Sequence, residues 1–180
     1  SDGGEQDLVS VAFDASGDEL RARIEYEIAL VDLDGEGRTR AAIPGIAPDH
    51  YLARRYAAYV ALSKTAYDDA IAASEAAVAA ARDMEEKIDA MLDLIYANFL
   101  AGRWTEARHH GLAALALVEE TQGDRAAGSV LFTLGYLAAD SGHWARANDV
   151  IARLRRFYQH AGDARRGREV DLIAAHVALG

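Results

Sequence analysis

The sequence has 180 residues, of which 29 are acidic and 19 are Lys or Arg, so the formal net charge is −10. This balance argues against nucleic-acid binding, which needs a basic face to neutralise phosphates. The absence of cysteine excludes disulfides, thiolate metal sites and a cysteine nucleophile. No apolar run approaches the about 20 residues that a membrane span requires, and the N-terminus lacks a secretory signal pattern, so we expect a cytoplasmic protein that does not contact membranes.

Residues 1–48 are predicted to form a separate N-terminal segment. Apolar and charged residues alternate from Ile24 to Ile28, which is typical of a half-buried strand. The same alternation occurs from Val9 to Phe13, and Asp34–Gly37 favours a turn. We therefore predict a β-hairpin or a short meander of two or three strands within residues 7–43.

A helix is the alternative for the same stretch. The Ser16-Gly17-Asp18-Glu19 sequence can form a capping box at its start. An apolar stripe follows at helical spacing, made of Leu20, Ile24, Ile28 and Val31. A second stripe of Tyr26, Leu30 and Leu33 would then face the opposite side. The strand interpretation leaves fewer apolar side chains misplaced and is favoured, while the helix stays open.

An all-α domain is predicted for residues 49–180. Hydrophobic residues make up 51 % of the sequence, and many of them are alanine, which has the highest helix propensity. Both prolines, Pro44 and Pro48, precede this region, and Asp49 can cap its first helix. Apolar periodicity predicts seven helices, at about 50–63, 68–82, 85–101, 105–120, 124–141, 145–160 and 165–179. Short turns indicate antiparallel pairs at about 50–83, 84–122 and 123–162, followed by a terminal helix at 165–180.

A short motif recurs in this domain. Gly102–Ala107 and Gly142–Ala147 both read Gly-x-Trp-x-x-Ala and lie 40 residues apart (142 − 102 = 40). A degenerate copy, Thr65–Ala70, has its alanine 37 residues before that of the next copy (107 − 70 = 37). A fixed period in this range indicates a stacked array of helix pairs. The residues expected to pack these pairs together are Gly102, Trp104, Ala107, Gly135, Gly142, Trp144 and Ala147.

These residues resemble tetratricopeptide (TPR) repeats over about residues 51–180. Leu131, Leu134 and Gly135 stand where the family has Trp, Leu and Gly on its first helix, and Gly142–Ala147 stands at its turn. The period of 37–40 residues exceeds the family's about 34, and the closing proline is absent. Long periods of this kind resemble the arrays of large bacterial ATP-dependent regulators and of kinesin light chains. The resemblance implies a right-handed α-solenoid of antiparallel helix pairs.

The resemblance also implies a concave groove, lined by the first helix of each pair, in which partner segments dock. The family's groove positions select the aromatic residues Tyr56, Tyr59, Tyr96, Phe99, Phe132 and Tyr136. Three tyrosines at equivalent positions would form a ladder that offers contact area at low rotamer cost, and Asp93 suits an apolar or basic segment. The family's clamp for a terminal carboxylate is rejected, because only Arg55 is suitable for it. The alternative is that the rings fill gaps between alanine-rich helices.

No pattern in the sequence is typical of catalysis or of cofactor binding. Adjacent helical residues such as His109 and His110 point about 100° apart, and neither they nor His143 have carboxylates at a metal-binding spacing. We therefore expect no enzymatic activity, no cofactor and no metal.

The expected function is a protein–protein interaction module of a larger bacterial regulatory or signalling protein, which docks a partner peptide or helix on the aromatic groove. A start at Ser1 and an end within a helix favour a piece of a longer protein. The alternative is a structural spacer or a self-association element without a peptide ligand. Such an element would form a homo-oligomer through its exposed terminal repeat.

Overall fold

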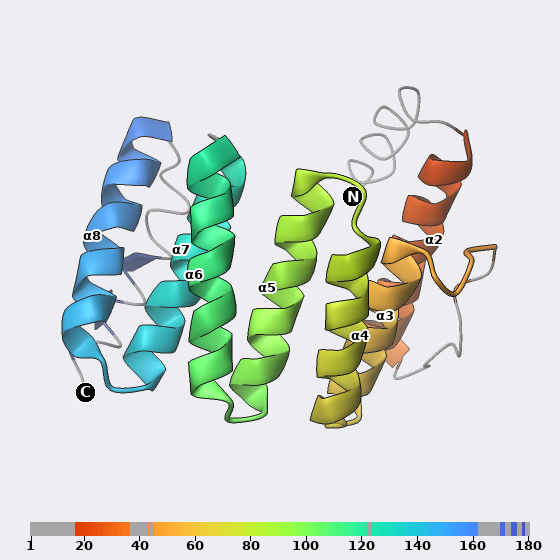
Figure 1. Ribbon diagram of the computed structural model, residues 1–180, viewed down its shortest axis with the longest axis horizontal. Coiled ribbons are helices and arrows are strands. Elements are labelled where there is room, and N and C mark those ends of the chain that lie inside the picture. Colours follow the sequence, from red (N-terminus) through yellow and green to blue (C-terminus); the bar gives the residue numbers. More distant parts are fainter. Residues whose placement is uncertain are drawn as a thin grey trace.

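The computed structural model describes residues 17–36, 43, 45–121 and 124–161, together with residues 170, 171, 174, 175 and 178. These residues form helices and no β-strand, and each helix packs mainly against its neighbours in sequence (Figure 1). The helices are α2 (Gly17–Glu36), α3 (Tyr51–Ser63), α4 (Tyr67–Ala80), α5 (Met84–Leu100), α6 (Trp104–Thr121), α7 (Asp124–Asp140) and α8 (Trp144–Ala161). They follow one another in chain order along the molecule, with α2 at one end and α8 at the other.

The six helices from α3 to α8 agree with the predicted positions within a few residues. The cap of the first of them differs from the prediction, because His50 and not Asp49 is the N-cap of α3. The Nδ1 atom of His50 accepts a hydrogen bond from the backbone N–H of Leu52 at 3.2 Å. The predicted helix at 165–179 lies almost entirely outside the described residues.

The strand prediction for Ile24–Ile28 is wrong, since these residues belong to the 20-residue helix α2. The buried face of α2 consists of Ala22, Tyr26 and Ala29, which pack in one cluster with residues of α3. Two alanines on either side of one aromatic ring allow this face to lie close to α3. The apolar stripe of the helical alternative does not form the contact either, because Ile24 and Ile28 are 37 % and 43 % exposed. The predicted strand at Val9–Phe13 lies outside the described residues.

The three motif copies share one backbone geometry. Thr65, Gly102 and Gly142 have φ values of 56°, 73° and 73°, in the left-handed region. In the second copy the N–H of Gly102 donates to the carbonyl of Phe99, and that of Arg103 donates to the carbonyl of Asn98. The same two bonds recur at Thr65 and Gly142, so each copy ends its helix with a Schellman motif. All three turns lie along the lower edge of the molecule in Figure 1.

Small residues set the helix spacing above these turns. The motif alanines Ala70, Ala107 and Ala147 are completely buried, as predicted for the two tryptophan-containing copies. A further close approach was not predicted: a Cβ atom on Gly111 of α6 would lie 2.5 Å from Cδ2 of Leu134 on α7. A side chain at residue 111 would therefore require the Leu134 side chain to move.

The other residues predicted to pack the repeats are less uniform. Gly135 is buried within α7, whereas Trp104 and Trp144 keep more than a third of their surface exposed. The ring of Trp104 meets that of Phe99 edge to face, with 5.0 Å between ring centroids. Trp104 therefore covers the turn between α5 and α6 and still presents part of its ring to solvent.

Candidate functional site

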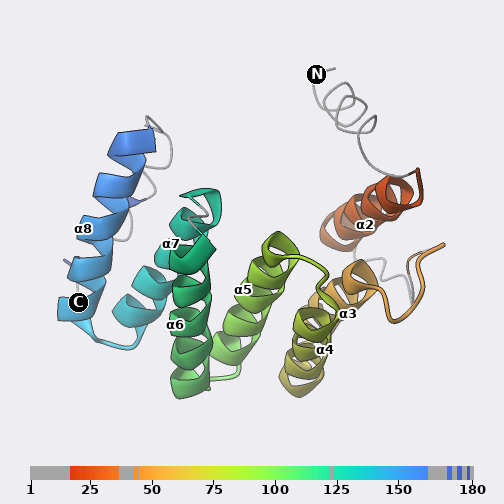
Figure 2. The same ribbon diagram turned by 45° about the horizontal axis from the view of Figure 1, so that its top comes forward.

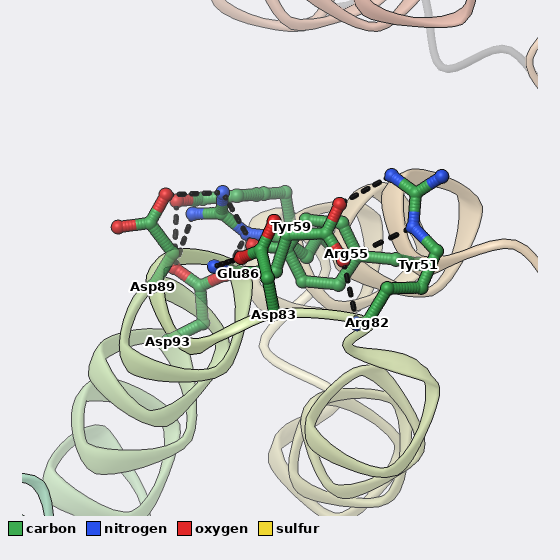
Figure 3. A network of polar contacts seen from close by, with 8 residues as sticks. All are labelled: Tyr51, Arg55, Tyr59, Arg82, Asp83, Glu86, Asp89 and Asp93. Atoms are coloured by element: carbon green, nitrogen blue, oxygen red, sulfur yellow. Dashed lines mark hydrogen bonds and ion pairs between the residues drawn. The ribbon is translucent and has the colours of Figure 1, made fainter. Parts of the chain in front are cut away.

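The predicted groove residues fall into two separate groups, and the first group surrounds Arg55. We call Tyr51, Arg55, Tyr59, Asp89 and Asp93 the Arg55 cluster, which joins α3 to α5 (Figure 3). The Nε and Nη2 atoms of Arg55 donate to the two carboxylate oxygens of Asp93, at 2.5 and 3.2 Å. The Tyr59 hydroxyl donates to Oδ1 of the same carboxylate at 2.9 Å. Such two-pronged pairing is the strong form of an Arg–carboxylate contact.

The Arg55 cluster is closed by further contacts. The Nη1 atom of Arg55 lies 3.3 Å from both the Asp89 carboxylate and the Tyr51 hydroxyl. The guanidinium also lies over the rings of Tyr26, from α2, and Tyr51, at 5.8 and 5.6 Å from the ring centroids. Helix α2 therefore contributes directly to the surroundings of the Arg55 charge.

Burial shapes the ionisation of the Arg55 cluster. Burial alone lowers the pKa of Arg55, but the hydrogen bond and the charge of Asp93 outweigh it and hold this pKa above its ordinary value. Burial, aided by the nearby Asp93, raises the pKa of the Tyr59 hydroxyl, and burial raises the pKa of Asp89 although Arg55 opposes it. Arg55 thus stays charged and Tyr59 neutral near neutral pH. Because Asp93 is already occupied on both oxygens, its carboxylate serves the fold.

The second group of predicted groove residues consists of two exposed tyrosines and two half-buried phenylalanines. Tyr96 on α5 and Tyr136 on α7 occupy equivalent positions 40 residues apart, and they are 51 % and 46 % exposed. Each lies beside a half-buried phenylalanine of its own helix: the Tyr96 and Phe99 rings are stacked at 6.5 Å, and the Phe132 and Tyr136 centroids are 6.2 Å apart. We call these four residues the aromatic face.

The predicted tyrosine ladder therefore does not continue uniformly into the first helix pair. Tyr59 is half-buried and tied to Asp93. Tyr56 is buried in the cluster of apolar residues that joins α2 and α3. Sequence spacing relates Tyr59, Tyr96 and Tyr136 to one another at intervals of 37 and 40 residues. It could not indicate their different burial, which depends on α2 and Arg55.

A cavity between α6 and α8 was missed by the sequence interpretation. It has a volume of about 270 Å³, and we call it the α6–α8 groove. Apolar side chains of α7 line it between the two helices, and three arginines from α6 and α8 contribute to its walls. The residues that characterise it are Arg108, Leu112, Leu134, Leu137, Arg146 and Arg153. The available signal was Leu112 four residues after Arg108 on a second helix, a pair that helical periodicity places on one face.

Histidines and acidic residues make no metal site in the part of the chain that the structure describes, where no three such side chains are grouped suitably. The rings of His109 and His110 lie 5.7 Å apart. Burial, and then the neighbouring His109, lower the pKa of His110, while Glu75 and Glu106 partly oppose this.

Among the described residues, no helix combines the length and the apolar character needed to cross a membrane.

Comparison with models of protein families and with curated proteins finds no significant match for the chain. The geometry of the aromatic face, the Arg55 cluster and the α6–α8 groove is therefore the basis for inferring a function.

Proposed function

We propose that the chain is a TPR-like right-handed α-solenoid that serves as a non-catalytic protein–protein interaction module in a larger bacterial regulatory or signalling protein. A partner peptide or helix docks on the aromatic face. The solenoid assignment is supported by three turns of one geometry and by the fully buried alanine that follows each of them.

One observation carries the docking proposal: about half of the surface of both Tyr96 and Tyr136 is exposed at equivalent positions on successive first helices. Rings that only filled gaps between helices would be buried. Two exposed tyrosines, each beside a phenylalanine, offer a partner a large apolar area with a hydroxyl at its edge.

The test is affinity capture from a lysate of the source organism, with the wild-type chain and a Tyr96→Ser/Tyr136→Ser variant. We expect the variant to keep its helical circular dichroism and to lose the partner, because both side chains are about half exposed and neither belongs to the hydrophobic core. Ile28→Ser is the matched control, since Ile28 on α2 is a comparably exposed apolar residue, 43 % exposed, outside both the aromatic face and the α6–α8 groove.

The spacer interpretation predicts a different result. It gains some support from Phe99 and Phe132, which pack against the core between α5 and α8. If the variant captures the same proteins as the wild type, or if neither captures any, docking on the aromatic face is wrong. Loss of the partner from Ile28→Ser alone would assign the interaction to a surface that includes α2.

A further inference from the structure

The α6–α8 groove combines an apolar floor with basic walls. Leu134 and Leu137 of α7 are buried at its floor, and Leu112 of α6 is 50 % exposed at its side. Arg108 on α6 and Arg146 on α8 are exposed and line the groove from opposite helices. No carboxylate of the described residues forms an ion pair with either of them.

The charges around the groove are unbalanced. Three arginines, Arg108, Arg146 and Arg153, line it together with a single carboxylate, that of Asp149. This local excess of positive charge occurs in a chain whose net charge is −10. A positive site on an acidic protein selects a ligand by charge complementarity at the site.

The preceding helix pair shows that the fold does not require these arginines. The motif spacing relates the α6–α8 groove to the seam between α4 and α6, with offsets of 37 residues for α6 onto α4 and 40 for α8 onto α6. At the positions of the three arginines this seam has Ile71, Glu106 and Ala113, and Glu75 stands where the groove has Leu112. We call this seam the acidic seam, because it has exposed glutamates, Glu75 and Glu106, where the groove has Leu112 and Arg146.

The size and shape of the groove restrict its occupant. Its volume of about 270 Å³ falls just below the about 300–1,000 Å³ of small-molecule pockets, so it suits one or two large side chains that anchor a longer partner. A flat lipid surface would not reach the recessed leucines, and the overall negative charge opposes binding to nucleic acids and anionic membranes alike.

We propose that the α6–α8 groove binds an acidic amphipathic segment of a protein partner. A large apolar side chain of the segment enters between Leu112, Leu134 and Leu137. Carboxylates on either side of it pair with Arg108 and Arg146, whose planar guanidinium groups match carboxylate geometry. This surface adjoins the aromatic face through Trp104, which lines the groove and contacts Phe99, but none of the groove's arginines and leucines belongs to that face.

The test uses a displayed library of random linear peptides, selected on the full chain carrying Tyr96→Ser/Tyr136→Ser so that the aromatic face does not contribute. We expect the enriched peptides to contain Leu or Phe flanked by Asp or Glu. A synthetic copy of an enriched peptide should bind less tightly as salt is raised. It should lose at least about tenfold in affinity to Arg108→Glu, Arg146→Glu and Leu112→Ser, measured by fluorescence anisotropy.

Charge reversal provides the decisive comparison. A peptide with its acidic residues changed to lysine should bind the Arg108→Glu/Arg146→Glu chain better than the wild type, whereas Arg21→Glu on α2 should change neither affinity. Arg146→Glu introduces the residue found at the equivalent Glu106, so the fold should tolerate it. Phosphatidylglycerol vesicles serve as a second probe of the same chain. The proposal is overturned if selection yields no acidic peptides, if the arginine variants bind these peptides unchanged, or if the chain binds the vesicles and none of the peptides.

Discussion

The Arg55 cluster and the α6–α8 groove both place arginine beside apolar surface, and they differ in what meets the charge. Arg55 has a side chain only 14 % exposed, and it contacts two carboxylates and two aromatic rings of the same chain. Arg108 and Arg146 are exposed, and no ion-pair partner for them lies within the described residues. The same residue type therefore has a structural role at one end of the molecule and is available for recognition at the other.

Neighbouring helices account for the difference. At the first helix pair, α2 lies beside α3 (Figure 2) and brings Tyr26 onto Arg55. Helix α5 brings Asp89 and Asp93 to the same guanidinium (Figure 3). In the α6–α8 groove no described helix brings a carboxylate into an ion pair with Arg108 or Arg146. In such a series of packed helices, the role of an arginine can be inferred only when the partners supplied by adjacent helices are known.

The largest expected change in the free energy of unfolding comes from a substitution in the Arg55 cluster. Arg55→Leu, which copies the equivalent Leu92, should lower the free energy of unfolding by about 3–5 kcal/mol, because Asp93 would remain buried without its cation. Urea unfolding followed by circular dichroism measures this loss.

A double variant separates the charge from the packing. Arg55→Leu/Asp93→Thr gives both positions the residues found at equivalent places in other pairs, Leu92 and Thr133. It should recover most of the stability, since the buried carboxylate is removed together with its cation, and Asp89, which also loses Arg55, has a side chain that is 40 % exposed. A double variant as unstable as Arg55→Leu would mean that the pair matters through shape and not through charge.

Substitutions at the left-handed residues of the turns should change stability according to the backbone geometry of the turn. Gly142→Ala forces a Cβ atom into a left-handed conformation and should cost about 1 kcal/mol, whereas Thr65→Gly removes such a strain and should stabilise by a similar or smaller amount. Thermal unfolding of both variants would test this. Equal signs for the two substitutions would contradict a shared turn geometry.

Charge reversal in the α6–α8 groove should hardly affect stability. Arg146→Glu is expected to change the free energy of unfolding by less than about 0.5 kcal/mol, because the side chain is exposed and forms no described ion pair. The same urea assay used for Arg55→Leu gives the comparison. A loss close to that of Arg55→Leu would show that the groove arginine is structural after all.

The smallest expected effect concerns the acidic seam between α4 and α6. Because the folded-state pKa of His110 is lowered, the unfolded chain takes up a proton first as the pH falls through the ordinary value of 6.5. The folded state should lose stability in that window and below it, down to the lowered pKa. His110→Gln should reduce the acid-induced shift of the urea midpoint, and an identical shift in both chains would refute a role for His110.

Much of the helical array could be predicted from local sequence. The spacing of Gly102, Gly142 and the two tryptophans fixed the turns, because a left-handed residue after a helix is a local requirement. Thr65 could be identified as a third copy only through its aromatic and alanine neighbours, since threonine rarely adopts this conformation.

The remainder depended on contacts between distant residues. Alternation at Ile24–Ile28 suited a strand, and only packing of Tyr26 on α3 decides for a helix. The sequence favoured a partner-binding role for Asp93, but in the structure its carboxylate accepts hydrogen bonds from Arg55, which lies 38 residues earlier in the chain. The α6–α8 groove needs side chains from three helices, so no single sequence window contains its pattern.

The common form of the three turns also bears on how such a chain can change its length. Ala101 is followed by a left-handed glycine, and so is Ser141, with the same hydrogen bonds at both places. Excision of residues 102–141 would join Ala101 to Gly142 and recreate a turn that already exists. A duplication or deletion with these endpoints alters the number of helix pairs by whole units. Each new copy is then free to acquire its own surface, as the acidic seam and the basic groove illustrate.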